Sequence, residues 1–123
     1  MRWWTDLQFM IVALRRLRRA AELATRSTPA AHQVRAALAA FDAALPSLKT
    51  MRNIGEHFDS YALDSPGRHD KWIDRRQLEV GEWDGTTFRW LRQRDGRYHE
   101  LNTNDALAAA ERLYDAVRRT ALP

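Results

Sequence analysis

The chain contains no cysteine, and only two of its 20 basic residues are lysines. Without cysteine there is no disulfide framework and no thiolate metal site. The longest uninterrupted apolar run, Phe9–Leu14, has six residues, which is far too short to span a bilayer. Arginines follow that run at once, whereas a signal peptide needs a longer apolar region and a small-residue cleavage site. We therefore expect an uncleaved, cytoplasmic protein without a membrane span.

The length of 123 residues suits one domain over residues 1–123, and a chain of this size can bury a hydrophobic core. Apolar residues make up 45% of the sequence, which is ordinary for a globular protein. The net charge of +4 and the pI of about 10.1 are compatible with a polyanionic partner such as nucleic acid. The excess of arginine over lysine is also typical of proteins from GC-rich genomes, so composition alone leaves both explanations open.

Apolar residues recur at steps of three and four in four segments, which indicates amphipathic helices. The first helix has Leu7, Met10, Ile11, Leu14, Leu17, Ala21 and Ala24 on its apolar stripe. The last has Leu107, Ala110, Leu113, Tyr114 and Val117. The four helices are predicted over residues about 5–26, 29–45, 47–63 and 104–121. We expect the first two to pack antiparallel through a short connection.

Between residues 78 and 101 the apolar period changes from helical to two, and two Asp-Gly pairs, Asp84-Gly85 and Asp95-Gly96, interrupt it. Asp-Gly between alternating segments indicates a β-hairpin, because both residues tolerate the positive φ that tight turns need. Three strands of an antiparallel meander are predicted, at about residues 78–83, 86–93 and 97–101. Two-residue loops would pair Glu82 with Thr87 and Gly81 with Phe88, and one face would carry Trp83, Phe88, Trp90 and Leu101.

The expected fold is therefore mainly α: a four-helix bundle with a small three-stranded antiparallel β-meander inserted before the last helix, in the α+β class. A meander alone is unstable without a partner layer, so its apolar face should cover helices.

The third predicted helix carries an unusual polar stripe. Asn53 and His57 lie four residues apart, so a helix places them nearly one above the other. Ser60, Tyr61 and Asp64 continue this side, and Arg52 with Glu56 forms a second such pair beside it. The polar residues thus line up along one side of the helix, which randomly distributed surface charges would not do.

These residue types suit proton transfer beside a phosphate. Histidine exchanges protons near neutral pH, and arginine presents a planar fork of donors that matches phosphate oxygens. Together with an asparagine, they suit RNA cleavage by its own 2′-hydroxyl. The four histidines, His32, His57, His69 and His99, are scattered, so no metal site and no cofactor are predicted. One helix supplies one histidine and one arginine, and a two-fold dimer would supply two of each.

The segment Arg52-Asn53-Ile54-Gly55-Glu56-His57 resembles the motif of the HEPN superfamily, an arginine followed a few residues later by a histidine. A polar residue commonly stands directly after that arginine. The resemblance covers roughly residues 5–63 and 104–121, and it implies a HEPN-like helical domain that acts as a homodimeric, metal-independent endoribonuclease. Arg52, Asn53 and His57 would be catalytic, with Glu56, Ser60, Tyr61 and Asp64 supporting them or lining the dimer cleft. It also implies a toxin, paired with an antitoxin protein, or a phage-defence protein.

Other readings of these features remain open. The same polar stripe would serve a non-catalytic module that dimerises or docks a protein through Asn53 and His57. The cluster Arg15, Arg16, Arg18 and Arg19 fits a solvated helix face, an RNA-backbone track or a membrane-surface helix. Trp3 and Trp4 fit either a packed position or an exposed dimer surface.

Overall fold

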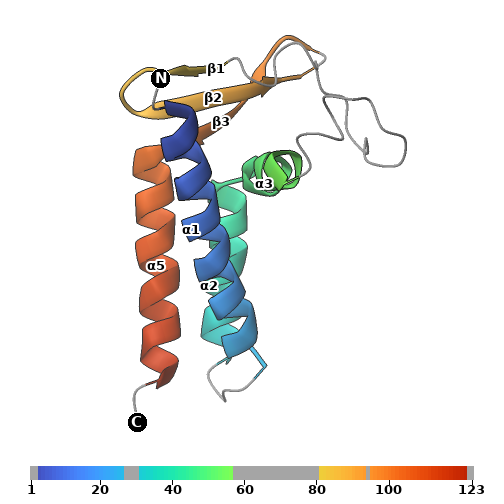
Figure 1. The fold of residues 1–123 in the computed structure, drawn as a ribbon. Coiled ribbons are helices and arrows are strands. Elements are labelled where there is room, and N and C mark those ends of the chain that lie inside the picture. The colour runs from blue at the N-terminus through green and yellow to red at the C-terminus, as the bar shows by residue number, and fades with distance from the viewer. Residues whose placement is uncertain (1–2, 27–30, 57–80, 94, 122–123) are drawn as a thin grey trace, which may run out of the picture. The chain divides into compact units, whose positions relative to one another are not determined.

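The computed structural model describes residues 3–26, 31–56, 81–93 and 95–121, and all elements below lie in these ranges (Figure 1). Four helices and a three-stranded sheet occur there, in the order α1 (Trp3–Ala24), α2 (Ala31–Ala44), α3 (Leu48–Glu56), β1 (Gly81–Trp83), β2 (Thr87–Arg92), β3 (Tyr98–Asn102) and α5 (Thr103–Ala121). The mainly α fold with an antiparallel sheet before the last helix is confirmed. The predicted stretch of the third helix beyond Glu56, residues 57–63, lies outside the described residues, as do residues 78–80 of the first predicted strand.

The described residues form two compact units. The described residues of the helical unit are 9–26, 31–46 and 104–121, and those of the sheet unit are 3–8, 47–56, 81–93 and 95–103. Helix α1 contributes its first residues to the sheet unit and the rest to the helical unit. That residues 1–123 form a single domain stays a prediction.

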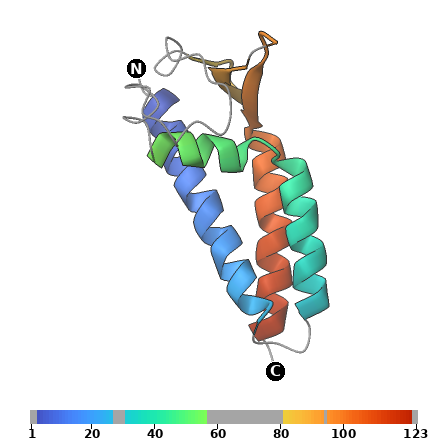
Figure 2. The same ribbon diagram turned by 90° about the vertical axis from the view of Figure 1, so that its right-hand side faces the viewer.

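In the helical unit, α1, α2 and α5 run side by side, with α2 antiparallel to the other two (Figures 1 and 2). The antiparallel packing expected for the first two helices is confirmed. Its buried apolar residues are Ile11, Leu14, Ala21, Ala31, Val34, Phe41, Leu45, Ala106, Ala109 and Leu113. On α1 the buried positions follow the predicted stripe, since residues that recur at steps of three and four share one side of a helix.

Helix α5 buries a face that overlaps the predicted one at Leu113 but is rotated away from Leu107 and Tyr114. Its buried residues are Ala106, Ala109 and Leu113, whereas Leu107 is 60% and Tyr114 is 57% exposed. Alanine-rich helices offer more than one continuous apolar stripe, and here the interior takes the stripe with the small side chains. Of the predicted stripe, Leu113 is buried and Ala110 and Val117 are half-buried, whereas Leu107 and Tyr114 face outward.

In the sheet unit, the strands pair in the order β1-β2-β3, all antiparallel. One sheet face carries Phe88, Trp90 and Leu101, each no more than 4% exposed. Trp83 lies opposite Phe88 on this face and stacks on its ring at a centroid distance of 4.4 Å. The predicted shared face of these four residues is confirmed, although Trp83 stays 39% exposed at the sheet margin.

The first residues of α1 complete the core of this unit. The Trp4 ring meets the Trp90 ring edge-on at 4.7 Å, and Trp3 is only 7% exposed. Leu7 is fully buried one turn further along the helix. Of the two roles left open for these tryptophans, the packed position is therefore the observed one for Trp3, and Trp4 is half-buried.

The first hairpin has a different register from the one predicted. Trp83 pairs with Phe88 and Gly81 with Trp90, so the ladder is shifted by two residues from the expected pairing of Gly81 with Phe88. The cause is the Asp84 carboxylate, whose Oδ1 accepts hydrogen bonds from the backbone N–H groups of Thr86 and Thr87, both at 2.9 Å. Asp84 is therefore the first of the four residues of the turn and not a central one. Gly85, with φ +101°, is the first central residue of the turn. A shift of two preserves the faces, because side chains alternate with a period of two.

The second hairpin, unlike the first, departs from a two-residue loop. The backbone N–H of Gln93 donates to Arg97 O at 2.6 Å, so three residues separate the paired ends. Earlier in β2, the register of its pairing with β3 changes between Trp90 and Arg92. Leu91, with φ +63°, is therefore a bulge residue. The bulge breaks the alternation and lets Leu91 be buried directly after the buried Trp90.

Among the described residues, none of the helices has the length and apolar character needed to cross a membrane.

Candidate functional site

Helix α3 carries the described part of the Arg52–His57 motif. The Met51 N–H donates to Ser47 O at 2.9 Å, which sets the first turn of the helix after Pro46. Leu48, Met51 and Ile54 are buried at steps of three, and Thr50 is 8% exposed. At 100° per residue these four side chains cover one side of α3 and leave the other side to its polar residues.

Arg52 and Asn53 lie on that polar side, and both are half-buried. They are neighbours in sequence, so their side chains diverge by about 100° around the helix axis. Arg52 borders the buried side next to Leu48, and its Nε is excluded from solvent. Arg52 and Asn53 therefore both lie in the arc of α3 that its buried residues leave open.

Lys49 is a polar residue of this face that the sequence analysis did not single out. It is exposed and lies three residues before Arg52 and four before Asn53. These spacings place its ammonium group between the two, one turn earlier. The signal was present in the sequence, since a cation three or four residues before the motif shares its helix face.

The remaining residues of the predicted site are not placed. Glu56 is the last residue of α3, whereas His57, Ser60, Tyr61 and Asp64 lie outside the described residues. The convergence of His57 with Arg52 therefore stays a prediction, and so does a cleft shared by two subunits.

A contact between Ser47 and His99 ties α3 to the sheet within the same unit. Ser47 Oγ lies 3.1 Å from His99 Nδ1, where one atom donates and the other accepts according to the ring tautomer. Ser47 precedes the first residue of α3, and His99 lies on β3 opposite Trp90. This hydrogen bond fixes the start of α3 against β3 and so helps to orient the Arg52–Asn53 face.

The arginine cluster on α1 is largely engaged within the helical unit. Arg18 donates from Nε and Nη2 to the two carboxylate oxygens of Asp42 on α2, both at 2.7 Å, and also pairs with Glu22. The hydrogen bonds that Arg18 donates to Asp42 are the main cause that raises the pKa of Arg18 above its usual value. Arg19 pairs with the same Glu22 at 3.2 Å. A fork-to-carboxylate pair of this kind joins α1 to α2.

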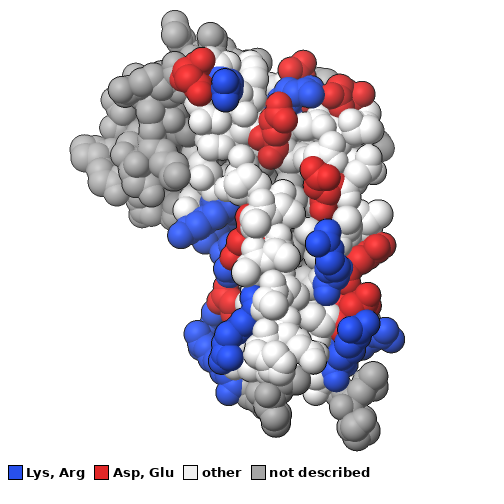
Figure 3. Space-filling view, turned by 180° about the vertical axis from the view of Figure 1, so that it is seen from behind, with Lys and Arg blue, Asp and Glu red and all other residues white. Residues whose placement is uncertain are grey.

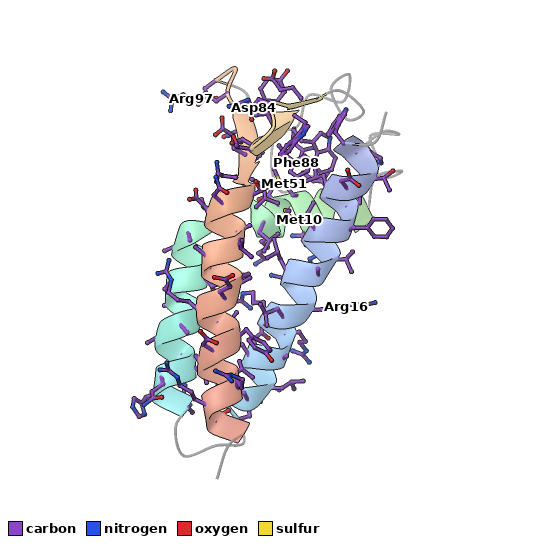
Figure 4. All side chains as sticks on the ribbon, turned by 90° about the vertical axis from the view of Figure 1, so that its left-hand side faces the viewer. Met10, Arg16, Met51, Asp84, Phe88 and Arg97 are labelled. Atoms are coloured by element: carbon purple, nitrogen blue, oxygen red, sulfur yellow. The ribbon has the colours of Figure 1, made fainter. Side chains whose placement is uncertain are left out.

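Arg15 is half-buried, whereas Arg16 and Arg19 are exposed, and Arg16 points away from the helices (Figure 4). On the face seen in Figure 3, acidic side chains stand among the basic ones along the helices. Of the four predicted RNA-backbone contacts, Arg18 therefore has the strongest competing role, and Arg16 is exposed without an ion pair among the described residues.

The outer face of the sheet is also charged. Arg89 on β2 pairs with Asp84 at 2.9 Å and with Glu100 of β3 at 3.2 Å. These hydrogen bonds raise the pKa of Arg89. Because cross-strand neighbours of opposite charge stabilise a sheet, this arrangement has a structural explanation.

Within the ranges that the structure describes, no group of three or more His, Cys, Asp or Glu side chains is placed to hold a metal ion. Comparison of the chain with protein-family models, with curated proteins and with solved structures finds no match.

Proposed function

We propose that this protein is a HEPN-like, metal-independent endoribonuclease that acts as a homodimer in the cytoplasm. The observation that carries the proposal is the sequence Arg52-Asn53 on the polar side of α3, followed by His57 five residues after the arginine. The net charge of +4 agrees with a polyanionic substrate. The biological setting we propose is that of a toxin held by an antitoxin protein, or of phage defence.

The proposed reaction needs only groups of this chain. The 2′-hydroxyl of RNA attacks the adjacent phosphorus, and its proton passes to the imidazole of one His57. The bond from phosphorus to the 5′-oxygen breaks, and the protonated His57 of the second subunit gives that oxygen a proton. Arg52 stabilises the added negative charge on the phosphate oxygens, and Asn53 donates a hydrogen bond to one of them. The products are a 2′,3′-cyclic phosphate and a free 5′-hydroxyl.

The test is cleavage of a labelled RNA by purified protein in the presence of EDTA. We expect cyclic phosphate ends, and a fall in rate of roughly a hundredfold or more for Arg52→Ala and for His57→Ala, because loss of one general acid–base or charge-stabilising group has that effect. Matched controls are Arg97→Ala, an exposed hairpin arginine, and His32→Ala, an exposed histidine of α2. Folded wild-type protein that leaves every RNA intact would refute the nuclease proposal, as would equal loss in the control variants.

A second candidate is a non-catalytic module that docks a protein partner through the Asn53 and His57 stripe. The half-buried state of Arg52 and its solvent-excluded Nε favour this candidate, because a structural arginine is held in this way. If the protein is such a module, Arg52→Ala lowers the free energy of unfolding, and neither the wild type nor the variant cleaves RNA. For the nuclease, Arg52→Lys keeps the charge and the fold but loses the planar fork and most of the activity.

A further inference from the structure

Helix α5 presents a stripe of four outward-facing residues in the helical unit, Leu107, Glu111, Tyr114 and Arg118. Their spacings of four, three and four residues keep them within an arc of about 60° at 100° per residue. The buried residues Ala106, Ala109 and Leu113 lie on another side of the same helix. We call these four residues the α5 stripe.

The α5 stripe exposes two large apolar side chains, whereas two of the three residues that α5 buries are alanines. Leu107 is 60% and Tyr114 is 57% exposed, although each would bury more apolar area than the alanines that α5 buries. Single exposed apolar residues are common and need no explanation. Two of them on the same face of one helix can form part of an interaction surface. The charged members of the stripe indicate what that surface contacts.

The charges of the α5 stripe are arranged so that the stripe complements itself. Glu111 lies three residues before Tyr114, and Arg118 lies four residues after it. At 1.5 Å per residue these are distances of about 4.5 and 6 Å along the axis. Consider a second α5 that runs antiparallel to the first, with the two Tyr114 residues at the two-fold axis. Measured along the helix axes, the Glu111 of each copy then lies within about 1.5 Å of the Arg118 of the other copy.

Both charged groups are available for such a contact. Arg118 approaches an acid of its own helix, Asp115, only at 3.8 Å, and both of these side chains are more than half exposed. Glu111 is exposed, and no ion pair involving it occurs in the part of the chain that the structure describes. Two reciprocal pairs around a central pair of tyrosines form an isologous contact, in which the same patch serves both subunits.

We propose that a second copy of this chain binds along the α5 stripe in antiparallel orientation. Reciprocal charge, acid facing base on both sides of the axis, fits a second copy better than an unrelated partner. The proposal does not rest on RNA cleavage. A dimer through another surface would refute it and would leave the homodimeric nuclease standing.

The test is molar mass by sedimentation equilibrium at several protein concentrations and low ionic strength. We expect wild-type protein to dimerise, and Glu111→Arg or Arg118→Glu to weaken the dimer roughly tenfold or more, because each places like charges opposite each other twice. A mixture of the two single variants should form heterodimers, since one copy then carries two acids and the other two bases. The double variant, with both charges exchanged, should dimerise like the wild type.

The matched control is Arg119→Glu, which makes the same charge change one residue further along and about 100° around the helix. It should leave the dimer unchanged. At a protein concentration too low for the wild type to dimerise, thermal unfolding followed by circular dichroism should be alike for all variants because the positions are exposed. A wild-type monomer at every concentration would overturn the proposal. A dimer that survives both single charge reversals, or a mixture of the variants that stays monomeric, would overturn it as well.

Discussion

Gly81, the first residue of β1, occupies a place where a side chain does not fit. A Cβ at this position would meet the backbone oxygen of Arg89 on the neighbouring strand and would lie 2.7 Å from Cη2 of Trp3. The backbone oxygen belongs to the sheet ladder and has little freedom to move. The absence of a side chain at Gly81 therefore lets Trp3 lie close over the edge of the sheet.

We expect Gly81→Ala to lower the free energy of unfolding by about 1–3 kcal/mol, the usual cost of forcing extra atoms into a packed site. Denaturation with urea, followed by tryptophan fluorescence, measures this loss. Ala43→Ser, which also adds one heavy atom but at an exposed position of α2, is the control and should change stability by less than about 0.5 kcal/mol. Equal stability of Gly81→Ala and the wild type would show that β1 can move away from Arg89.

At the scale of elements, the sequence predicted helices and strands better than it predicted which faces they bury. Apolar spacing located α1, α2 and the described part of α3, and the two Asp-Gly pairs located both hairpins. In α5, side-chain size was misleading, since Leu107 and Tyr114 made the predicted stripe more apolar than the observed one. Close packing against the neighbouring helices buried Ala106 and Ala109 instead. The apolar pattern of a single helix carries no information about the helices that pack against it.

The turns show a similar limit. Asp-Gly was expected to form the two central residues of the first turn, but Asp84 accepts hydrogen bonds from later residues of the turn and is therefore its first residue and not a central one. The bulge at Leu91 also could not be predicted, because positive φ is unfavourable for a leucine and is maintained by the surrounding structure. At the candidate site, the spacing correctly placed Arg52 and Asn53 on one helix. The same spacing could have identified Lys49, three residues before Arg52, as a further residue of that helix face.

The Asp84 turn makes stability depend on pH. Hydrogen bonds from the Thr86 and Thr87 N–H groups, and then from Arg89, hold the pKa of Asp84 well below its usual range. A carboxylate whose pKa is lower in the folded state contributes stability above its unfolded pKa, about 3.9, and loses that contribution as the pH falls further. The hairpin should therefore weaken in acid.

We expect Asp84→Asn to be less stable than the wild type at neutral pH and to lose less stability than the wild type as the pH is lowered below about 4. Urea denaturation at a series of pH values gives both curves. The matched control is Asp95→Asn in the second hairpin, where the carboxylate accepts a hydrogen bond from the N–H of Arg97 at 2.9 Å. Parallel curves for Asp84→Asn and the wild type would contradict the assigned cause.

At the scale of the whole molecule, two helices belong to both compact units. Residues 3–8 of α1 lie in the sheet unit and residues 9–24 in the helical unit, without a break in the helix. Helix α5 begins at Thr103, whose N–H and Oγ1 both donate to Thr86 O in the first turn of the sheet, and continues through the helical unit. Unfolding of either unit would therefore leave the other with an unsupported helix end, which favours joint unfolding.

Phe41→Ala tests this coupling, because Phe41 is 1% exposed in the helical unit and the four tryptophans that the structure describes lie in the sheet unit. Truncation of a buried phenylalanine costs about 3–5 kcal/mol. If the units unfold together, the midpoint measured by tryptophan fluorescence falls as far as the one measured by far-ultraviolet circular dichroism. Phe9→Ala, at a position that is 71% exposed, is the control and should move neither midpoint appreciably. A lowered circular dichroism midpoint with unchanged fluorescence would mean that the continuous helices do not couple the two units.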